Sequence, residues 1–146
     1  MLLEQAREIA EALLRQYQLT YKGWNYGYNN NKRRLGVCKY HEKRIELCRY
    51  YTLNNPDSCV IDTIRHEIAH ALVGPGNHHN GIWQSKAIEL GASPKPCKTI
   101  VAHVPVKWIA ICPECKRQYG QHRRPLLTRR YFCRDCRVSV VWQTGE

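Results

Sequence analysis

The chain has 146 residues, and 43% of them are apolar, which is enough for a hydrophobic core and excludes a wholly disordered polypeptide. This length fits one domain, or one domain with a small module held together by metal. The apolar runs are too short to span a membrane, and the first residues lack the basic start and apolar stretch of a secretory signal. We therefore expect a cytoplasmic protein, nucleoid-associated if bacterial, in which eight cysteines indicate metal binding before disulfides.

Positive charge is concentrated towards the end of the chain. The net charge is +11, and residues 105–146 carry nine basic and three acidic side chains, a net +6 in under a third of the length. Such a segment favours a polyanionic partner, nucleic acid first and an anionic membrane second. The charge alone is equally compatible with basic residues that only keep the protein soluble.

The first half of the chain predicts a helix followed by three strands. Apolar residues at helical spacing predict an amphipathic helix over residues 2–17. Two-residue alternation and turn residues then predict strands near 24–28, 35–40 and 44–50. We expect these strands to form a three-stranded antiparallel meander.

Two more helices and a linker should follow. A loop with good helix-starting residues precedes a second helix over about residues 57–72, which should stop at the Gly-Pro-Gly of residues 74–76. A third helix should cover residues 83–90, and the proline-rich residues 93–96 should form a linker to short β-rich runs around four cysteines. The predicted fold class is therefore α+β, with domains at 1–96 and 97–146.

The second predicted helix carries the motif His66-Glu67-Ile68-Ala69-His70. Residues four apart on a helix project from one face, so both imidazoles can bind a single ion. Glu67 lies beside them, where it can reach a water molecule on that ion and act as a general base. The apolar neighbours of the motif favour a buried helix over one with two surface histidines. The pattern predicts a catalytic zinc site.

A catalytic zinc needs a third protein ligand and one open position. The metzincin pattern fails because Gly76 stands where its third histidine should be. His79, with His78 as its neighbour, follows the Gly-Pro-Gly break, where the chain can turn back towards the metal. Glu89 lies on the third predicted helix and would complete a His-His-Glu site. Spacing alone leaves His79 and Glu89 about level.

Four cysteines near the end of the chain form two Cys-x-x-Cys pairs, Cys112 with Cys115 and Cys133 with Cys136. Their separation fits a four-cysteine zinc ribbon. Four thiolates close the coordination shell of zinc, so this second zinc should be structural. A segment this small needs metal in place of a large hydrophobic core.

Arginines and aromatic residues are interleaved around the ribbon cysteines. Arginine contacts to phosphate and aromatic stacking on bases together favour sequence-tolerant binding of single-stranded DNA. The alternative is that the aromatics only form the small core of the ribbon. The candidate nucleic-acid-binding residues are Arg117, Arg123, Arg124, Arg129, Arg130, Arg134, Trp108 and Tyr131.

Several motifs resemble those of the SprT-like metalloproteases. The first is the run from His66 to Leu72, followed by Gly74-Pro75-Gly76 and by His79 with Trp83 four residues on. Residues 36–40 and 45–47 are similar to strands of the family, and residues 87–92 to its third helix. The resemblance covers most of residues 1–100, and a C-terminal zinc module is also usual in the family.

The resemblance implies a zincin-like core and selects His79 as the third zinc ligand, with Glu89 outside the metal site. The sequence departs from the family at Asn80, where glycine is expected, and at Ile82, which is often acidic. These departures put the turn after His79 in question. The family includes the eukaryotic protease Spartan, and Spartan-like proteins act on proteins crosslinked to DNA.

The sequence therefore predicts a zinc-dependent endopeptidase with two zinc ions per chain. Glu67 would be the general base, and His66, His70 and His79 the ligands of the catalytic zinc. The expected substrate is a DNA-bound or DNA-crosslinked protein, with single-stranded DNA favoured and no membrane partner. The alternative is a DNA-binding zinc-ribbon protein whose protease site is weak or inactive.

Overall fold

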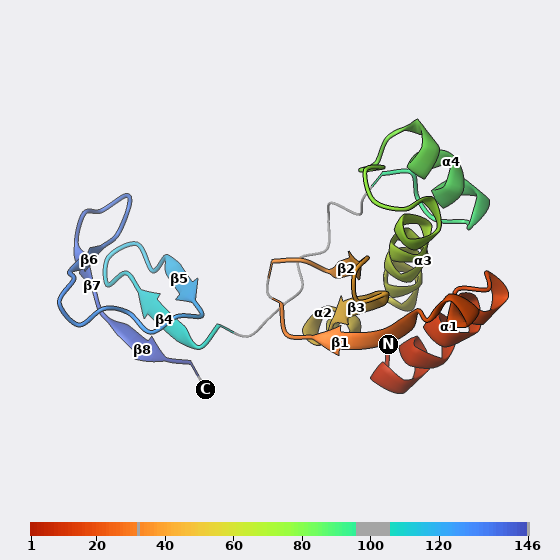
Figure 1. Ribbon diagram of the computed structural model, residues 1–146. Helices are drawn as coiled ribbons and strands as arrows, with labels where there is room; N and C mark the ends of the chain where they lie inside the picture. Colours follow the sequence, from red (N-terminus) through yellow and green to blue (C-terminus); the bar gives the residue numbers. More distant parts are fainter. Residues whose placement is uncertain (32, 96–105, 146) are drawn as a thin grey trace. The chain divides into compact units, whose positions relative to one another are not determined.

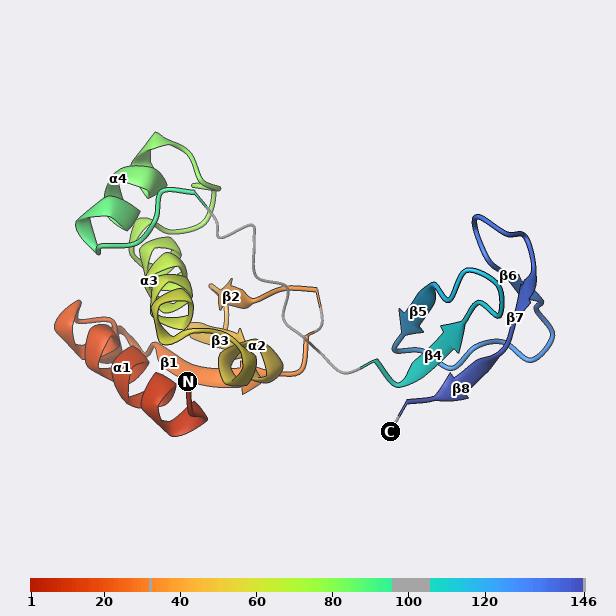
Figure 2. The ribbon, with the colours of Figure 1, turned by 180° about the vertical axis from the view of Figure 1, so that it is seen from behind.

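The computed structural model describes residues 1–31, 33–95 and 106–145, which fall into two compact units (Figures 1 and 2). The N-terminal unit spans Met1–Val104 and the C-terminal unit Pro105–Glu146. The fold is α+β, and the domain boundary predicted between residues 96 and 97 lies outside the described residues. Within the described ranges, every helix is too short or too polar to cross a bilayer.

The N-terminal unit contains all the helices of the described chain. Its elements in order are α1 (Leu3–Gln16), η1 (Thr20–Lys22), β1 (Asn25–Asn29), β2 (Gly36–Lys39), β3 (Arg44–Cys48), α2 (Arg49–Asn54), α3 (Asp57–Val73) and α4 (Gly81–Glu89). Helices α1 and α3 lie within about one residue of their predicted bounds, and α4 begins two residues earlier than predicted.

The short helix α2 was not predicted. The third strand was expected to reach Tyr50, but β3 ends at Cys48 and the chain turns directly into the helix. The sequence Tyr50-Tyr51-Thr52 has strand propensity, which misled the prediction. Tyr51 and Thr52 are fully buried in the helical conformation, so tertiary packing outweighs the local preference.

The predicted antiparallel meander is wrong. The strand order is β1-β3-β2, with β2 antiparallel to β3 but β1 parallel to it. The tight turn after β2 pairs it with β3, and β3 then occupies the centre of the sheet, where Ile45 and Leu47 are almost completely buried. Two-residue alternation indicates which face a residue lies on but not the direction of its partner strand.

Helices α1 and α3 cover one face of this sheet. Helix α1 contacts β1, helix α3 contacts β2 and β3, and the two helices contact each other (Figures 1 and 2). Their apolar stripes bury Leu14 of α1 and Val60, Ile64 and Ile68 of α3. Helix α3 is therefore fixed on two sides, which gives its functional residues a rigid base.

The C-terminal unit consists of short strands around the four cysteines. The strands are β4 (Trp108–Ile111), β5 (Gln118–Gln121), β6 (Tyr131–Phe132), β7 (Ser139–Val140) and β8 (Trp142–Thr144). They form an antiparallel sheet of order β5-β4-β8 and a separate β6-β7 pair. The buried cluster is small and includes two of the cysteines, Cys112 and Cys133.

The face of the N-terminal sheet turned away from the helices carries a buried carboxylate. Glu46 on β3 is only 7% exposed, and it accepts hydrogen bonds from Asn29 Nδ2 at 3.1 Å and Arg44 Nε at 2.8 Å. Lys39 Nζ lies 3.2 Å from Glu46 Oε2 and forms an ion pair with it. Burial alone would raise the pKa of Glu46, but the hydrogen bonds from Asn29, Arg44 and Lys39 outweigh it and hold the pKa below its ordinary value.

We predict that Glu46→Gln lowers the free energy of unfolding at pH 7 by roughly 1 kcal/mol, because charge-assisted hydrogen bonds are lost. A carboxyl whose folded-state pKa is lowered stabilises the fold above its unfolded-state pKa, and this contribution is lost as pH falls through the folded-state value. Urea unfolding followed by helical circular dichroism, with EDTA in all samples, should therefore show a difference that shrinks below about pH 4. An equal difference at pH 3 and pH 7 would contradict this account.

Candidate metal centres and nucleic-acid interface

Three histidine side chains meet at one point beside α3. His66 and His70 lie one turn apart on the helix, and their Nε2 atoms are 3.3 Å apart. His79, from the loop before α4, places its Nε2 at 3.0 Å from that of His66 and 3.1 Å from that of His70. The three nitrogens therefore form a nearly equilateral triangle.

The triangle fits a zinc ion. Imidazole nitrogens bound to tetrahedral zinc at about 2.0–2.1 Å lie about 3.3 Å apart. Burial, with a smaller contribution from the neighbouring histidines, lowers the pKa of His66 and of His70 to about 4. Both rings are therefore neutral near pH 7, as metal ligands must be. Three ligands on one side of the ion leave the open position that a catalytic zinc needs.

A network of asparagine side chains holds His79 in place. Helix α3 ends at Val73, its C-cap Gly74 has a φ of +82°, and Asn77 Nδ2 donates to Val73 O at 2.9 Å. Asn80 is the N-cap of α4, where its Oδ1 accepts from the backbone N–H of Trp83 at 3.1 Å. His79 itself has a φ of +56°, and its carbonyl accepts from Gln84 Nε2 at 3.0 Å.

Asn80 thus performs a structural task at the position where the family pattern has glycine. The left-handed residue of this turn is His79, and Asn80 has an extended backbone that needs no glycine. The departure noted in the sequence is accommodated by a helix cap.

Trp83 packs beneath the three imidazoles. It is fully buried, and its ring centroid lies 4.5 Å from those of His66 and His79 and 5.2 Å from that of His70. This ring contacts ligands from both the helix and the loop, so it sets the distance between α3 and the start of α4. The family pattern in the sequence includes Trp83, but spacing alone does not indicate this packing role.

Glu67 lies on the same helix but faces β2. A Cβ atom at Gly36 would come within 2.8 Å of Glu67 Oε1, so glycine is what lets the strand approach the carboxylate. A cavity of about 210 Å³ opens here, lined by His66 and Glu67 together with Arg34, Leu35, Gly36, Asp62 and Thr63. Burial raises the pKa of Glu67 to about 8, partly offset by the charge of Arg34. A divalent cation at the neighbouring histidines would favour the carboxylate form.

The alternative ligands lie away from the triangle. Glu89, at the end of α4, is exposed and forms an ion pair with Lys86 at 2.6 Å. His78 is also exposed, and the group of side chains able to hold a metal here consists of His66, His70 and His79. Geometry thus favours His79 as the third ligand, the residue that the family resemblance selects.

The four ribbon cysteines form a second candidate centre, with all their Sγ atoms within 4.8 Å of one another. The two Cys-x-x-Cys turns have the same backbone pattern. Cys112 N–H donates to Arg117 O and Lys116 N–H to Cys112 O, while Cys133 N–H donates to Val138 O and Arg137 N–H to Cys133 O. Lys116 and Arg137 each have a φ of +60°. Four converging sulfurs on two equivalent turns suit a closed zinc shell.

Tyr119 supports this shell from outside. Its hydroxyl donates to Cys133 Sγ at 3.1 Å and accepts from the backbone N–H of Arg134 at 3.0 Å. This hydrogen bond, more than the backbone hydrogen bonds from Cys136 and Asp135, lowers the pKa of the Cys133 thiol to about 6, which favours the thiolate. No spacing rule for cysteines points to this tyrosine, and the sequence analysis gave it no role at the metal.

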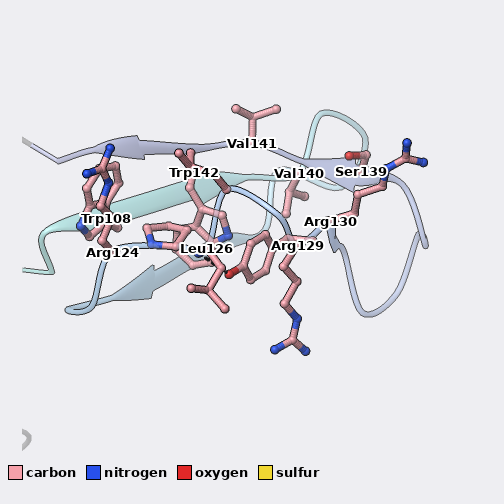
Figure 3. Close-up of a pocket in the computed structure, with 12 residues that line it drawn as sticks. Trp108, Arg124, Leu126, Arg129, Arg130, Ser139, Val140, Val141 and Trp142 are labelled. Atoms are coloured by element: carbon pink, nitrogen blue, oxygen red, sulfur yellow. Dashed lines mark hydrogen bonds between the residues drawn. The ribbon is translucent and has the colours of Figure 1, made fainter.

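Several predicted nucleic-acid-binding residues meet at a cavity of about 350 Å³ in the C-terminal unit. We call it the ribbon pocket. Figure 3 shows Trp108 and Arg124 at one end and Arg130 beside Ser139 at the other. The ribbon pocket is lined by Trp108, Arg124, Pro125, Leu126, Leu127, Arg129, Arg130, Tyr131, Ser139, Val140, Val141 and Trp142.

The other three predicted arginines do not line the ribbon pocket. Arg123 is exposed next to it, Arg134 is exposed at the second cysteine turn, and Arg117 forms an ion pair with Asp135 at 2.7 Å. Tyr131 and Trp142 pack edge to face at a centroid distance of 5.7 Å and also contact the small core. These aromatics therefore serve both the core and the pocket wall.

We predict that the purified protein binds two zinc ions and that His79→Ala lowers zinc affinity at one site. Loss of a direct ligand should lower zinc affinity by more than about a hundredfold. Mutation of residues that only hydrogen-bond to zinc ligands already lowers it about 10–100-fold. Glu89→Ala is the matched control and should leave affinity unchanged, because its only described partner is Lys86. Competition with a chromogenic chelator measures both. A site emptied by Glu89→Ala but not by His79→Ala would overturn the ligand assignment.

Comparison with known proteins places the N-terminal unit in a family. The family model described as SprT-like matches residues 6–103, which is most of the N-terminal unit and more than half of the chain. No curated protein matches the sequence. The matched region contains the three-histidine group and Glu67. The chain therefore belongs to the SprT-like family.

Proposed function

We propose that this protein is a zinc-dependent endopeptidase whose N-terminal unit has a zincin-like core. The observation that carries the proposal is the triangle of histidine nitrogens, 3.0–3.3 Å on a side, with Glu67 on the same helix and facing a cavity. Membership of the SprT-like family supports the same reading. His66, His70 and His79 would hold the ion, and Glu67 would be the general base.

The chemistry needs one group that supplies Lewis acidity and one that moves protons. Zinc, when bound, makes water acidic near pH 7 and polarises a carbonyl group. Glu67 accepts the proton of the attacking water on its carboxylate and passes it to the nitrogen of the leaving amine. Its close contact with Gly36 restricts its rotamers.

The substrate backbone should bind along β2. This strand is at the edge of the sheet order β1-β3-β2, and the cavity beside Glu67 is lined by Gly36, its first residue, and by the preceding Leu35. An extended peptide can add to such an edge through main-chain hydrogen bonds, which gives affinity without demanding one sequence. We infer a peptidase of broad specificity that cleaves extended segments.

The C-terminal unit should bring this activity to DNA. It carries a net charge of +6 over residues 105–146, and its pocket combines exposed Arg124, Arg129 and Arg130 with Trp108 and Tyr131. Guanidinium groups suit phosphates and aromatic rings suit unpaired bases. We propose that the protein binds DNA, single strands in preference, and cleaves DNA-bound or DNA-crosslinked proteins.

Glu67→Gln should retain zinc and fold but lose about 10²–10⁴-fold in peptidase activity, because an amide cannot accept the proton. The assay is cleavage of a basic DNA-binding protein, with and without single-stranded DNA, by zinc-loaded protein. Zinc content and circular dichroism serve as controls. Undiminished cleavage by Glu67→Gln would refute the assignment of the base, and an inactive wild type would favour a DNA-binding protein without protease function.

Replacing Arg123, Arg124, Arg129 and Arg130 by alanine should weaken binding to all DNA sequences alike. With about four phosphate contacts to a single strand, the slope of log affinity against log salt should be near −3 for the wild type and shallower for the variant. Both zinc sites should stay filled, since none of the four is a ligand. Fluorescence anisotropy over a salt series measures the DNA affinity of both proteins. An affinity that does not change with salt would exclude the phosphate contacts.

A further inference from the structure

The loop of residues 123–130 carries an apolar tip between two pairs of arginines. Its sequence is Arg-Arg-Pro-Leu-Leu-Thr-Arg-Arg, and it lies between β5 and β6. Leu126 and Leu127 are 63% and 90% exposed. Burial of two adjacent leucines so exposed at a loop tip would be favourable, so they are suited to contact with another molecule.

The tip has a defined conformation. Arg129 N–H donates to Leu126 O at 3.1 Å and closes a turn with Leu127 and Thr128 at its centre. Leu126 N–H donates to the hydroxyl of Tyr131 at 3.0 Å, which ties the turn to β6. The Arg129 guanidinium carbon lies 5.7 Å from the centre of the Tyr131 ring. Leu127 therefore lies on a turn that hydrogen bonds hold in one conformation, so binding requires little further loss of conformational entropy.

The charges around the tip favour a polyanion. All four flanking arginines are exposed, and within the described chain none has an acidic group within 4.0 Å. Figure 3 shows Arg124 and Arg130 at opposite ends of the ribbon pocket, with Leu126 between them. Cations on both sides of an apolar projection match a ligand with phosphates on both sides of an apolar stack, as in nucleic acid.

We propose that Leu127 inserts between two stacked bases of DNA while the flanking arginines bind the phosphates on either side. The inference rests on the proposed association with DNA and adds how the ribbon acts on it. Unstacking one base step costs free energy, and burial of leucine with several phosphate contacts offsets this cost. The tip thereby distorts the bound DNA locally and exposes base faces beside the ribbon pocket.

The test uses the full-length, zinc-loaded protein and a short duplex that carries 2-aminopurine at a central step. Insertion unstacks the probe, so wild-type protein should raise its fluorescence. Leu127→Ser should abolish the rise and weaken binding roughly tenfold, with an unchanged salt slope because the arginines remain. Ile111→Ser is the matched control, since Ile111 is an aliphatic residue of the same unit that is 47% exposed and does not line the ribbon pocket. It should behave as the wild type.

The possible failures are distinguishable. A fluorescence rise and affinity that survive in Leu127→Ser would overturn insertion while leaving the association with DNA intact. Failure of the wild type to bind either duplex or single strand would remove the association and the insertion together. Leu127-dependent binding to phosphatidylcholine–phosphatidylglycerol vesicles, without any change in 2-aminopurine, would assign the tip to an anionic membrane and overturn the proposal.

Discussion

The convergence of three imidazole nitrogens to within 3.3 Å is the constraint on which the N-terminal unit depends. Nitrogens this close cannot all be protonated, and the burial of His66 and His70 keeps these two rings neutral. Neutral lone pairs at this distance repel unless a cation lies between them. The packing of the surrounding helices and strands therefore has to hold the three imidazole rings together.

Helix α3, helix α4 and strand β2 each position a different part of the site. Helix α3 supplies two histidines because its apolar face is buried against β2, β3 and α1. Helix α4 supplies the floor of the site through Trp83, and Asn80 caps that helix where His79 enters. Strand β2 reaches Glu67 only because Gly36 has no side chain. The metal site, the general base and the edge strand are thus positioned by the same few contacts.

In the C-terminal unit, the candidate metal ligands bear on the stability of a small fold. Its buried cluster is too small to stabilise the strands alone, and two of its four buried members are cysteines. Four sulfurs within 4.8 Å of one another can close a zinc shell completely, whereas three neutral histidines leave one position open. The difference in ligand number and type is what separates a structural centre from one that can carry chemistry.

Local patterns predicted the local parts of this structure. Spacing along one helix was enough to place His66, Glu67 and His70 together, and paired cysteines were enough to indicate the ribbon. Non-local features were beyond reach: alternation in β1 could not reveal its parallel pairing with β3, and spacing could not separate His79 from Glu89. The latter choice depends on a left-handed residue and an asparagine cap after the Gly-Pro-Gly break.

Some residues gave no signal of their role at all. Tyr119 donates to a cysteine 14 residues further along the chain, and its role follows only from the folded geometry of the two cysteine turns. Leu127 is unremarkable in sequence, since an exposed position cannot be told from a buried one in so short a β-rich segment. Tertiary structure decided both.

The most direct test of the account is anomalous X-ray diffraction at the zinc edge from crystals grown with zinc. The account predicts two peaks, one about 2.0–2.1 Å from the Nε2 atoms of His66, His70 and His79, and one about 2.3 Å from the four ribbon sulfurs. A filled ribbon with no peak at the histidines, or a peak there that excludes His79, would contradict it.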